Sequence, residues 1–260
     1  MTLTTALILI SAGILVGFIN TLAGGGSAIS LSVLILLGLP ANVANGTNRI
    51  AILIQNLGAV GNFKRHKALD TRKAIYLSIP AIFGSILGAY IATDINESMI
   101  KKIIGVILII LFFLMLLNPK KWIQEHQITS NKKISISQII TFFLIGIYGG
   151  FIHIGVGYAL LAGIVLNAGY DLVKANAIKV LIILLWTPLS LLVFWKHHQI
   201  NLTYGLIMGI GNFLGAILAS QIAVKKGANF VRFLVMAIII FMSAHLLGFI
   251  DIISIFKSLN

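Results

Sequence analysis

Long apolar stretches cover most of this 260-residue chain. A membrane-spanning helix needs about 20 mostly apolar residues, so eight such segments with short loops would use nearly the whole sequence. Charged residues make up 10% of the chain, against about 25% in a soluble domain, and cannot cover a water-facing surface. The sequence therefore predicts an all-α integral membrane protein with about eight transmembrane segments. The apolar runs fall at 5–37, 45–63, 74–93, 99–117, 138–168, 174–195, 202–223 and 229–249.

The first and fifth runs are too long for one plain span, and each contains glycines in its middle. Glycine accepts backbone conformations that other residues avoid, so it is a common point at which a helix breaks. We expect both runs to be broken helices or re-entrant pairs. The glycines are Gly24, Gly25 and Gly26 in the first run, and Gly149, Gly150, Gly155 and Gly157 in the fifth.

The net charge of +13 comes from 19 Lys and Arg residues against 6 Asp and Glu. In a soluble protein such a surplus would suggest nucleic-acid binding. Here most of it lies in short loops, notably 64–73 and 118–137, which the positive-inside rule assigns to the cytoplasm. We therefore predict a multi-pass protein of the cell (inner) membrane, surrounded by the lipid bilayer, with no nucleic-acid partner. The sequence leaves the oligomeric state open.

The two halves of the chain resemble each other. Residues 24–110 align with residues 155–241 at a constant offset of 131 without a gap, and 18 of the 87 pairs are identical. We interpret this pattern as the duplication of a four-segment unit, with the broken first and fifth elements in corresponding places. The identical pairs include the two glycine breaks: Gly24 with Gly155, and Gly26 with Gly157.

The duplication divides the chain into a first transmembrane repeat (1–118), a cytoplasmic connecting loop (119–136) and a second transmembrane repeat (137–260). Internal repeats with interrupted helices in corresponding positions are typical of secondary transporters and mark their binding site. Whether the copies are parallel or inverted depends on whether the broken elements cross once or return. A cytoplasmic position for the basic loop 224–232 favours inversion slightly.

The charged residues of the spans are cations. All six acids lie in or beside loops, whereas Arg49 and Lys179 lie a few residues inside the second and sixth spans. A charge inside a span is costly and indicates a functional site, although a cation near a span end can also reach the headgroups. Glycine breaks expose backbone N–H groups and begin half-helices, whose N-termini favour an anion. The candidate substrate-binding residues are Asn20, Gly24, Gly25, Gly26, Ser27, Thr47, Asn48, Arg49, His153, Gly155, Gly157, Asn176 and Lys179.

A family resemblance supports this interpretation. The first half contains GFINTLAGGGSAISLSVLILLGLPANVANGTNRIA, in which a glycine-rich break is followed by Gly-Leu-Pro and then by Gly46-Thr47-Asn48. This stretch resembles the first-repeat signature of the TauE/SafE sulfite exporter family, and GYDLVKANAIKV is similar to the second signature. The second copy departs from the first, with Ala177-Ile178-Lys179 in place of Gly-Thr-Asn. The resemblance implies a bacterial or archaeal inner-membrane permease for sulfite, sulfonates or related anions.

The sequence thus predicts a permease for a small anion, a sulfur oxyanion or organosulfonate, exported by alternating access. It predicts no catalytic residues, no metal site and no cofactor. One alternative is an intramembrane enzyme, but the chain has no HExxH or GxSxG motif, no paired carboxylates in a span and no cysteine. The other alternative is a non-transporting membrane scaffold, which would need neither matched helix breaks nor buried cations.

The topology can be tested because the chain contains no cysteine. A Thr71→Cys variant in loop 64–73 should resist a membrane-impermeant thiol reagent in intact cells and react once the membrane is permeabilised. Labelling in intact cells would contradict a cytoplasmic loop.

Overall fold

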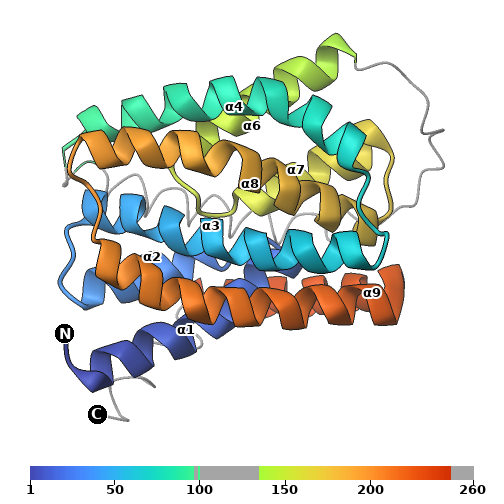
Figure 1. Ribbon diagram of the computed structural model, residues 1–260. Coiled ribbons are helices and arrows are strands. Elements are labelled where there is room, and N and C mark those ends of the chain that lie inside the picture. Colours follow the sequence, from blue (N-terminus) through green and yellow to red (C-terminus); the bar gives the residue numbers. More distant parts are fainter. Residues whose placement is uncertain (97–98, 100–134, 247–260) are drawn as a thin grey trace.

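The chain forms an assembly of helices in which the longest elements pack side by side (Figure 1). The structure is a computed structural model that describes residues 1–96, 99 and 135–246. Within these residues the chain is helical and contains no strand, which confirms the predicted all-α class. The elements are α1 (Leu3–Leu22), α2 (Ser27–Leu36), α3 (Ala41–Arg65), α4 (Thr71–Asp94), α6 (Ile136–Phe151), α7 (Val156–Ala162), the π-helix η2 (Gly163–Asn167), α8 (Leu172–Lys196) and α9 (Leu202–Leu246).

Four of the described helices are long and apolar enough to cross a membrane: α1, α4, α8 and the Leu202–Gly227 part of α9. Gly227 has a φ of +74° and interrupts α9 at the point where the sequence separates its last two apolar runs. Almost all of the predicted span 99–117 and of the connecting loop 119–136 lies outside the described residues.

The first broken element is a hairpin of α1 and α2, interrupted at residues 23–26, where Gly24 has a φ of +96°. The second is a hairpin of α6 and α7, interrupted at residues 152–155, where Gly155 has a φ of +70°. Both breaks use a left-handed backbone conformation that glycine adopts without strain.

Three glycines expected at the second break lie in helices instead. Gly149 and Gly150 are in α6, and Gly157 is in α7. Gly149 and Gly150 have neighbours that leave no room for a side chain. A β-carbon at Gly150 would lie 2.0 Å from the carbonyl oxygen of Ser85, and one at Gly149 would lie 2.9 Å from the Trp186 ring. In this run, therefore, some glycines allow close helix packing, and Gly155 forms the break.

Small residues also bring the helices into parallel pairs. Gly13 and Gly17 of α1 lie against Met208 and Asn212 of α9. Both helices advance by four residues between these contacts, so they run parallel. In the same way Gly84 and Gly88 of α4 lie against Phe143 and Ile147 of α6. Small residues at such positions allow two helix backbones to approach closely.

The helices α3 and α8 run in opposite directions. Near the start of α3, the Thr47 hydroxyl oxygen accepts a hydrogen bond (2.8 Å) from the backbone N–H of Asn201, just after α8. Beyond the end of α3, Asp70 accepts a hydrogen bond (2.6 Å) from Tyr170, just before α8. Each helix therefore begins beside the end of the other.

Because α3 and α8 are antiparallel, the two hairpins enter the protein from opposite edges. α4 follows α3 and α9 follows α8, so their parallel partners, α6 and α1, also start at opposite edges. The short return arms, α2 and α7 with η2, lead directly into α3 and α8 at the edges where their hairpins entered. Each broken element is thus a re-entrant pair of helices.

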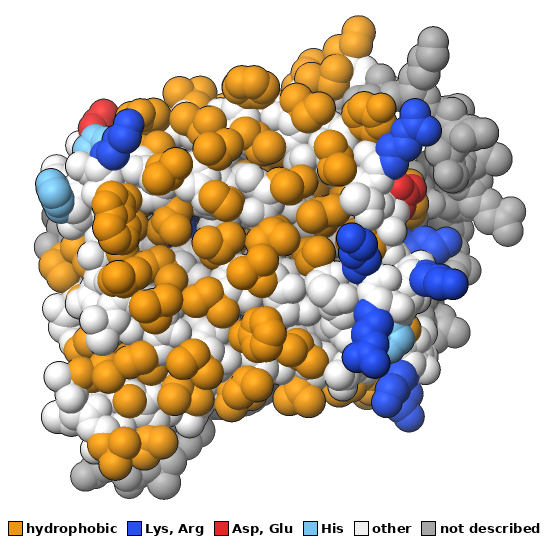
Figure 2. All heavy atoms as spheres, viewed as in Figure 1, with side chains coloured by type: hydrophobic (Ala, Val, Ile, Leu, Met, Phe, Trp, Pro, Cys, Tyr) orange, Lys and Arg blue, Asp and Glu red, His pale blue; other side chains and the backbone are white. Residues whose placement is uncertain are grey.

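The surface suits a bilayer. Figure 2 shows apolar side chains spread across the face in view and most of the Lys and Arg side chains in view gathered along one edge. The junction of α3 and α4 contributes exposed basic residues: Lys64 and Arg65 at the end of α3, Lys67 in the loop and Arg72 at the start of α4. α3 is more polar than the four apolar helices and is largely buried among its neighbours.

We expect Gly88→Ala to destabilise the protein, because its β-carbon would lie 2.0 Å from the carbonyl oxygen of Ile147. Separating two packed backbones costs about 1–3 kcal/mol or more. The matched control is Gly61→Ala in α3, where a β-carbon meets nothing within 4 Å. Thermal unfolding in detergent should show a lower Tm for Gly88→Ala alone, and equal Tm values would contradict the packing.

Candidate functional site

The tips of the two hairpins touch. A β-carbon on Gly24 would lie 2.3 Å from the Cα of Gly157, and the reverse distance is the same. Beside this contact, a β-carbon on Gly25 would lie 2.5 Å from the Tyr158 hydroxyl. Only glycine permits so close an approach of two backbones. The breaks of the two halves, far apart in sequence, therefore share one location.

Lys179 of α8 binds the end of α1. Its side chain is fully buried, and its ammonium donates to the carbonyl oxygens of Asn20 (3.0 Å) and Thr21 (2.8 Å) and to Oδ1 of Asn176 (2.6 Å). These three bonds use all three donors of the ammonium group. The last carbonyls of a helix lack partners within the helix and carry partial negative charge, which a cation stabilises.

Arg49 of α3 binds the end of α6 in the corresponding way. Its fully buried guanidinium donates to the carbonyl oxygens of Gly149 (3.0 Å) and Gly150, and to the Ser190 hydroxyl at 3.4 Å. The ring of Phe194 covers the group at 4.5 Å. Both side chains are fully buried and bonded to protein groups, which contradicts the alternative interpretation as snorkelling residues. Each cation binds the broken helix of the other half.

A chain of hydrogen bonds joins the two breaks. Asn20 Nδ2 donates to Gln55 Oε1 (3.2 Å) and to Ser27 Oγ (3.3 Å). Ser27 Oγ in turn lies 3.5 Å from Nδ1 of His153 at the second break. The His153 ring packs edge-on against Trp186, with ring centroids 6.3 Å apart. The same region includes Asn48, whose Oδ1 accepts a hydrogen bond from Ser30 of α2 (2.7 Å).

Several buried polar atoms have no hydrogen-bond partner among the described residues, and most can donate. Buried polar groups in proteins are nearly always paired, so such a group indicates a function or a ligand. The acceptors are Asn45 Oδ1, Asn56 Oδ1, Gln138 Oε1 and Gln199 Oε1. The groups that can donate are Thr21 Oγ1, Asn48 Nδ2, Arg49 Nε, His153 Nε2, Tyr158 Oη, Asn176 Nδ2 and Trp186 Nε1.

The site contains positive charge without a buried carboxylate. Of the acids that the structure describes, Asp70 and Asp171 are partly exposed and Asp94 is exposed. Among the same residues, no group of three His, Asp or Glu side chains could hold a metal ion. This arrangement can attract an anion and offer it hydrogen-bond donors.

The structure brings most of the predicted residues to the meeting point of the hairpins or to helix ends beside it. Thr47 is an exception, since its hydroxyl oxygen accepts from Asn201 at the protein edge. The sequence reasoning missed Tyr158 and Trp186. The 131-residue offset pairs them with Ser27 and Gln55, so the internal alignment itself contained a signal for both.

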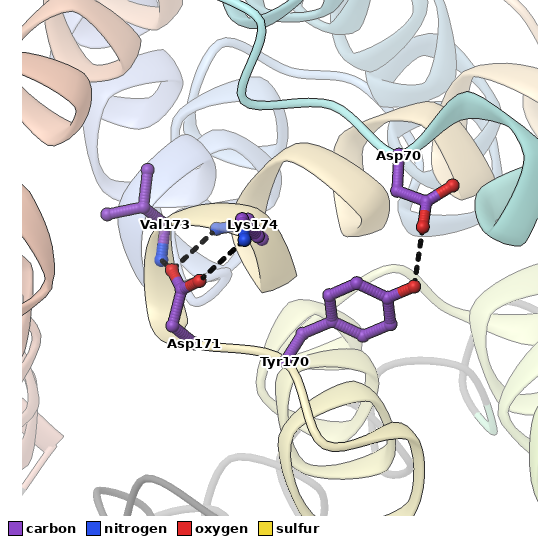
Figure 3. A network of polar contacts seen from close by, with 5 residues as sticks. All are labelled: Asp70, Tyr170, Asp171, Val173 and Lys174. Atoms are coloured by element: carbon purple, nitrogen blue, oxygen red, sulfur yellow. Dashed lines mark hydrogen bonds and ion pairs between the residues drawn. The ribbon is translucent and has the colours of Figure 1, made fainter. Parts of the chain in front are cut away.

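A second polar network lies at the basic edge (Figure 3). Tyr170 donates to Asp70 (2.6 Å), while Asp171 caps α8 by accepting from the backbone N–H groups of Val173 (2.9 Å) and Lys174 (3.0 Å). Burial alone would raise the pKa of Asp70. The backbone N–H of Lys73, the Tyr170 hydroxyl and the charges of Lys73 and Lys174 outweigh it and lower that pKa.

Comparison with known proteins gives the class of this one. A family model described as "Sulfite exporter TauE/SafE" matches residues 9–246, nearly the whole chain. The chain belongs to the TauE/SafE family and is a membrane transporter, as the resemblance implied.

Similar proteins match this chain over most of their length. "Probable membrane transporter protein ORF9" of Sinorhizobium sp is 27% identical over 238 residues, covering 91% of this chain and 90% of the relative. A "Probable membrane transporter protein" of Haemophilus influenzae is 27% identical, covering 92% and 93% of the two chains. "Probable membrane transporter protein YfcA" of Escherichia coli (strain K12) is 26% identical, covering 92% and 88%. Their names support transport rather than catalysis.

The Asp70–Tyr170 hydrogen bond predicts a pH-dependent contribution to stability. Because the folded pKa of Asp70 is lowered, its stabilisation is present above the ordinary carboxyl pKa and is lost as pH falls through the folded value. Tyr170→Phe removes one cause of the lowering, so its Tm should fall below that of the wild type near neutral pH. This difference should shrink in acid.

The control for that measurement is Tyr76→Phe, because Tyr76 is 44% exposed on the outer face of α4. A Tyr170→Phe deficit that is equal at every pH would contradict the assigned role of Asp70.

Proposed function

We propose that this transporter carries a small anion, a sulfur oxyanion or organosulfonate, out of the cell. The observation that carries the proposal is the pair of fully buried cations, Arg49 and Lys179, with no buried carboxylate among the described residues. Each cation faces a helix end that carries only about half a negative charge. A positive field therefore remains between the hairpins, and an anion would neutralise it.

The proposed binding place is the meeting point of the hairpin tips. There Arg49 and Lys179 act through their charge, because their hydrogen bonds hold helix ends. The amides of Asn48 and Asn176 and the backbone of the glycine breaks offer donors nearby. Asn20 and Ser27 support these groups through their own bonds rather than by touching the anion.

We propose that the two halves are inverted copies that rock against each other to give alternating access. The opposite directions of α3 and α8 and the entry of the hairpins from opposite edges support inversion. Positive φ angles recur at positions 131 residues apart, which supports the same backbone conformation in the two halves. These pairs are Gly24 with Gly155, Gly38 with Gly169, and Lys67 with His198.

The membrane potential can drive export of an anion. An inside-negative potential favours outward movement of one negative charge by about 2.3 kcal/mol per 100 mV. The basic edge would then face the cytoplasm of a cell whose inner membrane contains the protein. No coupling ion is required for this direction of transport.

We expect Arg49→Ala and Lys179→Ala each to abolish anion flux. Purified protein in proteoliposomes would be assayed with sulfite, thiosulfate, sulfoacetate, taurine and simple carboxylates. The control is Lys174→Ala, which removes a lysine whose side chain is 57% exposed and should leave flux unchanged. Normal flux through both buried-cation variants would contradict the proposal.

Loss of a buried charge can also unfold a protein, because its former partners remain unpaired. Arg49→Lys and Lys179→Arg retain the charge and should preserve folding and part of the flux. Size-exclusion profiles and Tm values for all variants separate a loss of fold from a loss of transport.

A further inference from the structure

We infer that three neutral aromatic donors, on His153, Tyr158 and Trp186, hold the oxyanion head of the substrate, and that they select anions whose oxygens carry no proton. The inference rests on the proposed anion transport and specifies the chemistry of its site. It assigns to the aromatic groups direct contacts that Lys179 does not make, because all three donors of its ammonium are already bonded.

The three side chains are buried and have hydrogen-bonding capacity to spare. His153 is 4% exposed, Tyr158 is 6% exposed and Trp186 is fully buried. Nε2 of His153, Oη of Tyr158 and Nε1 of Trp186 lack a partner among the described residues. Leaving one such buried group unpaired is costly, so three together call for a ligand.

Contacts place these groups around the joined hairpin tips. The Tyr158 hydroxyl lies against Gly25 of the first break, and His153 belongs to the second. Trp186 extends from α8 to the edge of the His153 ring and to Gly149 at the end of α6. Trp186 thus lies beside Gly149, whose carbonyl oxygen Arg49 binds. His153 is linked through Ser27 to Asn20, whose carbonyl oxygen Lys179 binds.

We assign the tautomer of His153 from the hydrogen-bond chain of the first hairpin. Ser27 Oγ accepts from Asn20 Nδ2 and keeps its own proton to donate, so we assign Nδ1 of His153 as the acceptor of the 3.5 Å contact. In a neutral imidazole one nitrogen accepts and the other carries the proton. With Nδ1 as the acceptor, Nε2–H is the donor. Ser27 is thus a positioning residue for His153.

This donor set favours a particular ligand chemistry. The Trp186 indole can only donate, and the assigned His153 tautomer also donates at Nε2. A sulfonate or a sulfite dianion presents three oxygens without hydrogen, one for each aromatic donor. An O–H group placed against Trp186 or against Nε2 of His153 would direct a proton at an N–H and leave buried groups unpaired, which such sites reject strongly. Only the Tyr158 hydroxyl could accept that proton, and it would then no longer donate to an oxygen of the anion.

Methanesulfonate and methylphosphonate provide the matched probes. In mildly acidic buffer both carry one negative charge and have similar shapes, but only methylphosphonate has an O–H. We expect wild-type protein in detergent to bind methanesulfonate at least about tenfold more tightly by calorimetry, from the loss of one charge-assisted hydrogen bond. Equal affinity for the two probes would overturn the inference.

Conservative variants test the individual donors. Trp186→Phe and Tyr158→Phe keep a ring and remove the N–H or O–H, and each should weaken methanesulfonate binding about tenfold or more while reducing the preference over methylphosphonate. Ser27→Ala should reduce the preference with less effect on total affinity, because it frees the His153 tautomer. The control is Trp195→Phe, whose side chain is 53% exposed.

The outcomes separate this inference from the proposed function. If the wild type transports no anion of the panel, the proposed function fails. If it transports anions but does not bind methanesulfonate, or if Trp186→Phe and Tyr158→Phe leave the preference unchanged, anion transport stands and the aromatic site is wrong. A variant that fails to fold is recognised by its Tm. In that case the preference of the Ser27→Ala variant for methanesulfonate over methylphosphonate decides: a reduced preference supports the aromatic site, and an unchanged one contradicts it.

Discussion

Two helices of this protein end in its interior, and their last carbonyl groups need donors that the chain must supply from elsewhere. Water cannot reach them, and an unpaired polar group in an apolar setting is costly. Lys179 meets the carbonyls at the end of α1, and Arg49 meets those at the end of α6. The rest of the structure depends on these contacts, because without them neither re-entrant hairpin could stop and turn where it does.

Both contacts connect one half of the chain to the other. A movement of the first half relative to the second must therefore change the surroundings of both helix ends together, while the glycine contact between Gly24 and Gly157 keeps the tips at one place. This geometry suits a transporter in which two halves move about a common centre. The same cations give the centre its positive charge, so the proposed anion site rests on the feature that stabilises the hairpins.

The sequence anticipated much of this plan, and its errors are informative. The helix class, the first break and the places of Arg49 and Lys179 along the spans could be predicted, because apolar length, glycine clusters and isolated charges are local signals. Whether the two cations were buried or reached the headgroups stayed open in the sequence. Gly149 and Gly150 were assigned to a break but lie in α6, because a glycine needed for close packing looks the same in sequence as one needed for a turn. Thr47 was expected at the site, but its partner is Asn201, a contact that only the opposite directions of α3 and α8 create.

By itself, the sequence determined that the chain lies in a membrane, that it has a strong surplus of positive charge and that no acid lies in a span to oppose its two internal cations. These properties depend on composition and on position along the chain. Only the tertiary structure decided that each cation binds the opposite half, that the two breaks touch, and that Tyr158 and Trp186 lie beside them with free donors. Such facts depend on how distant helices pack, and hydrophobic periodicity does not specify which helices become neighbours.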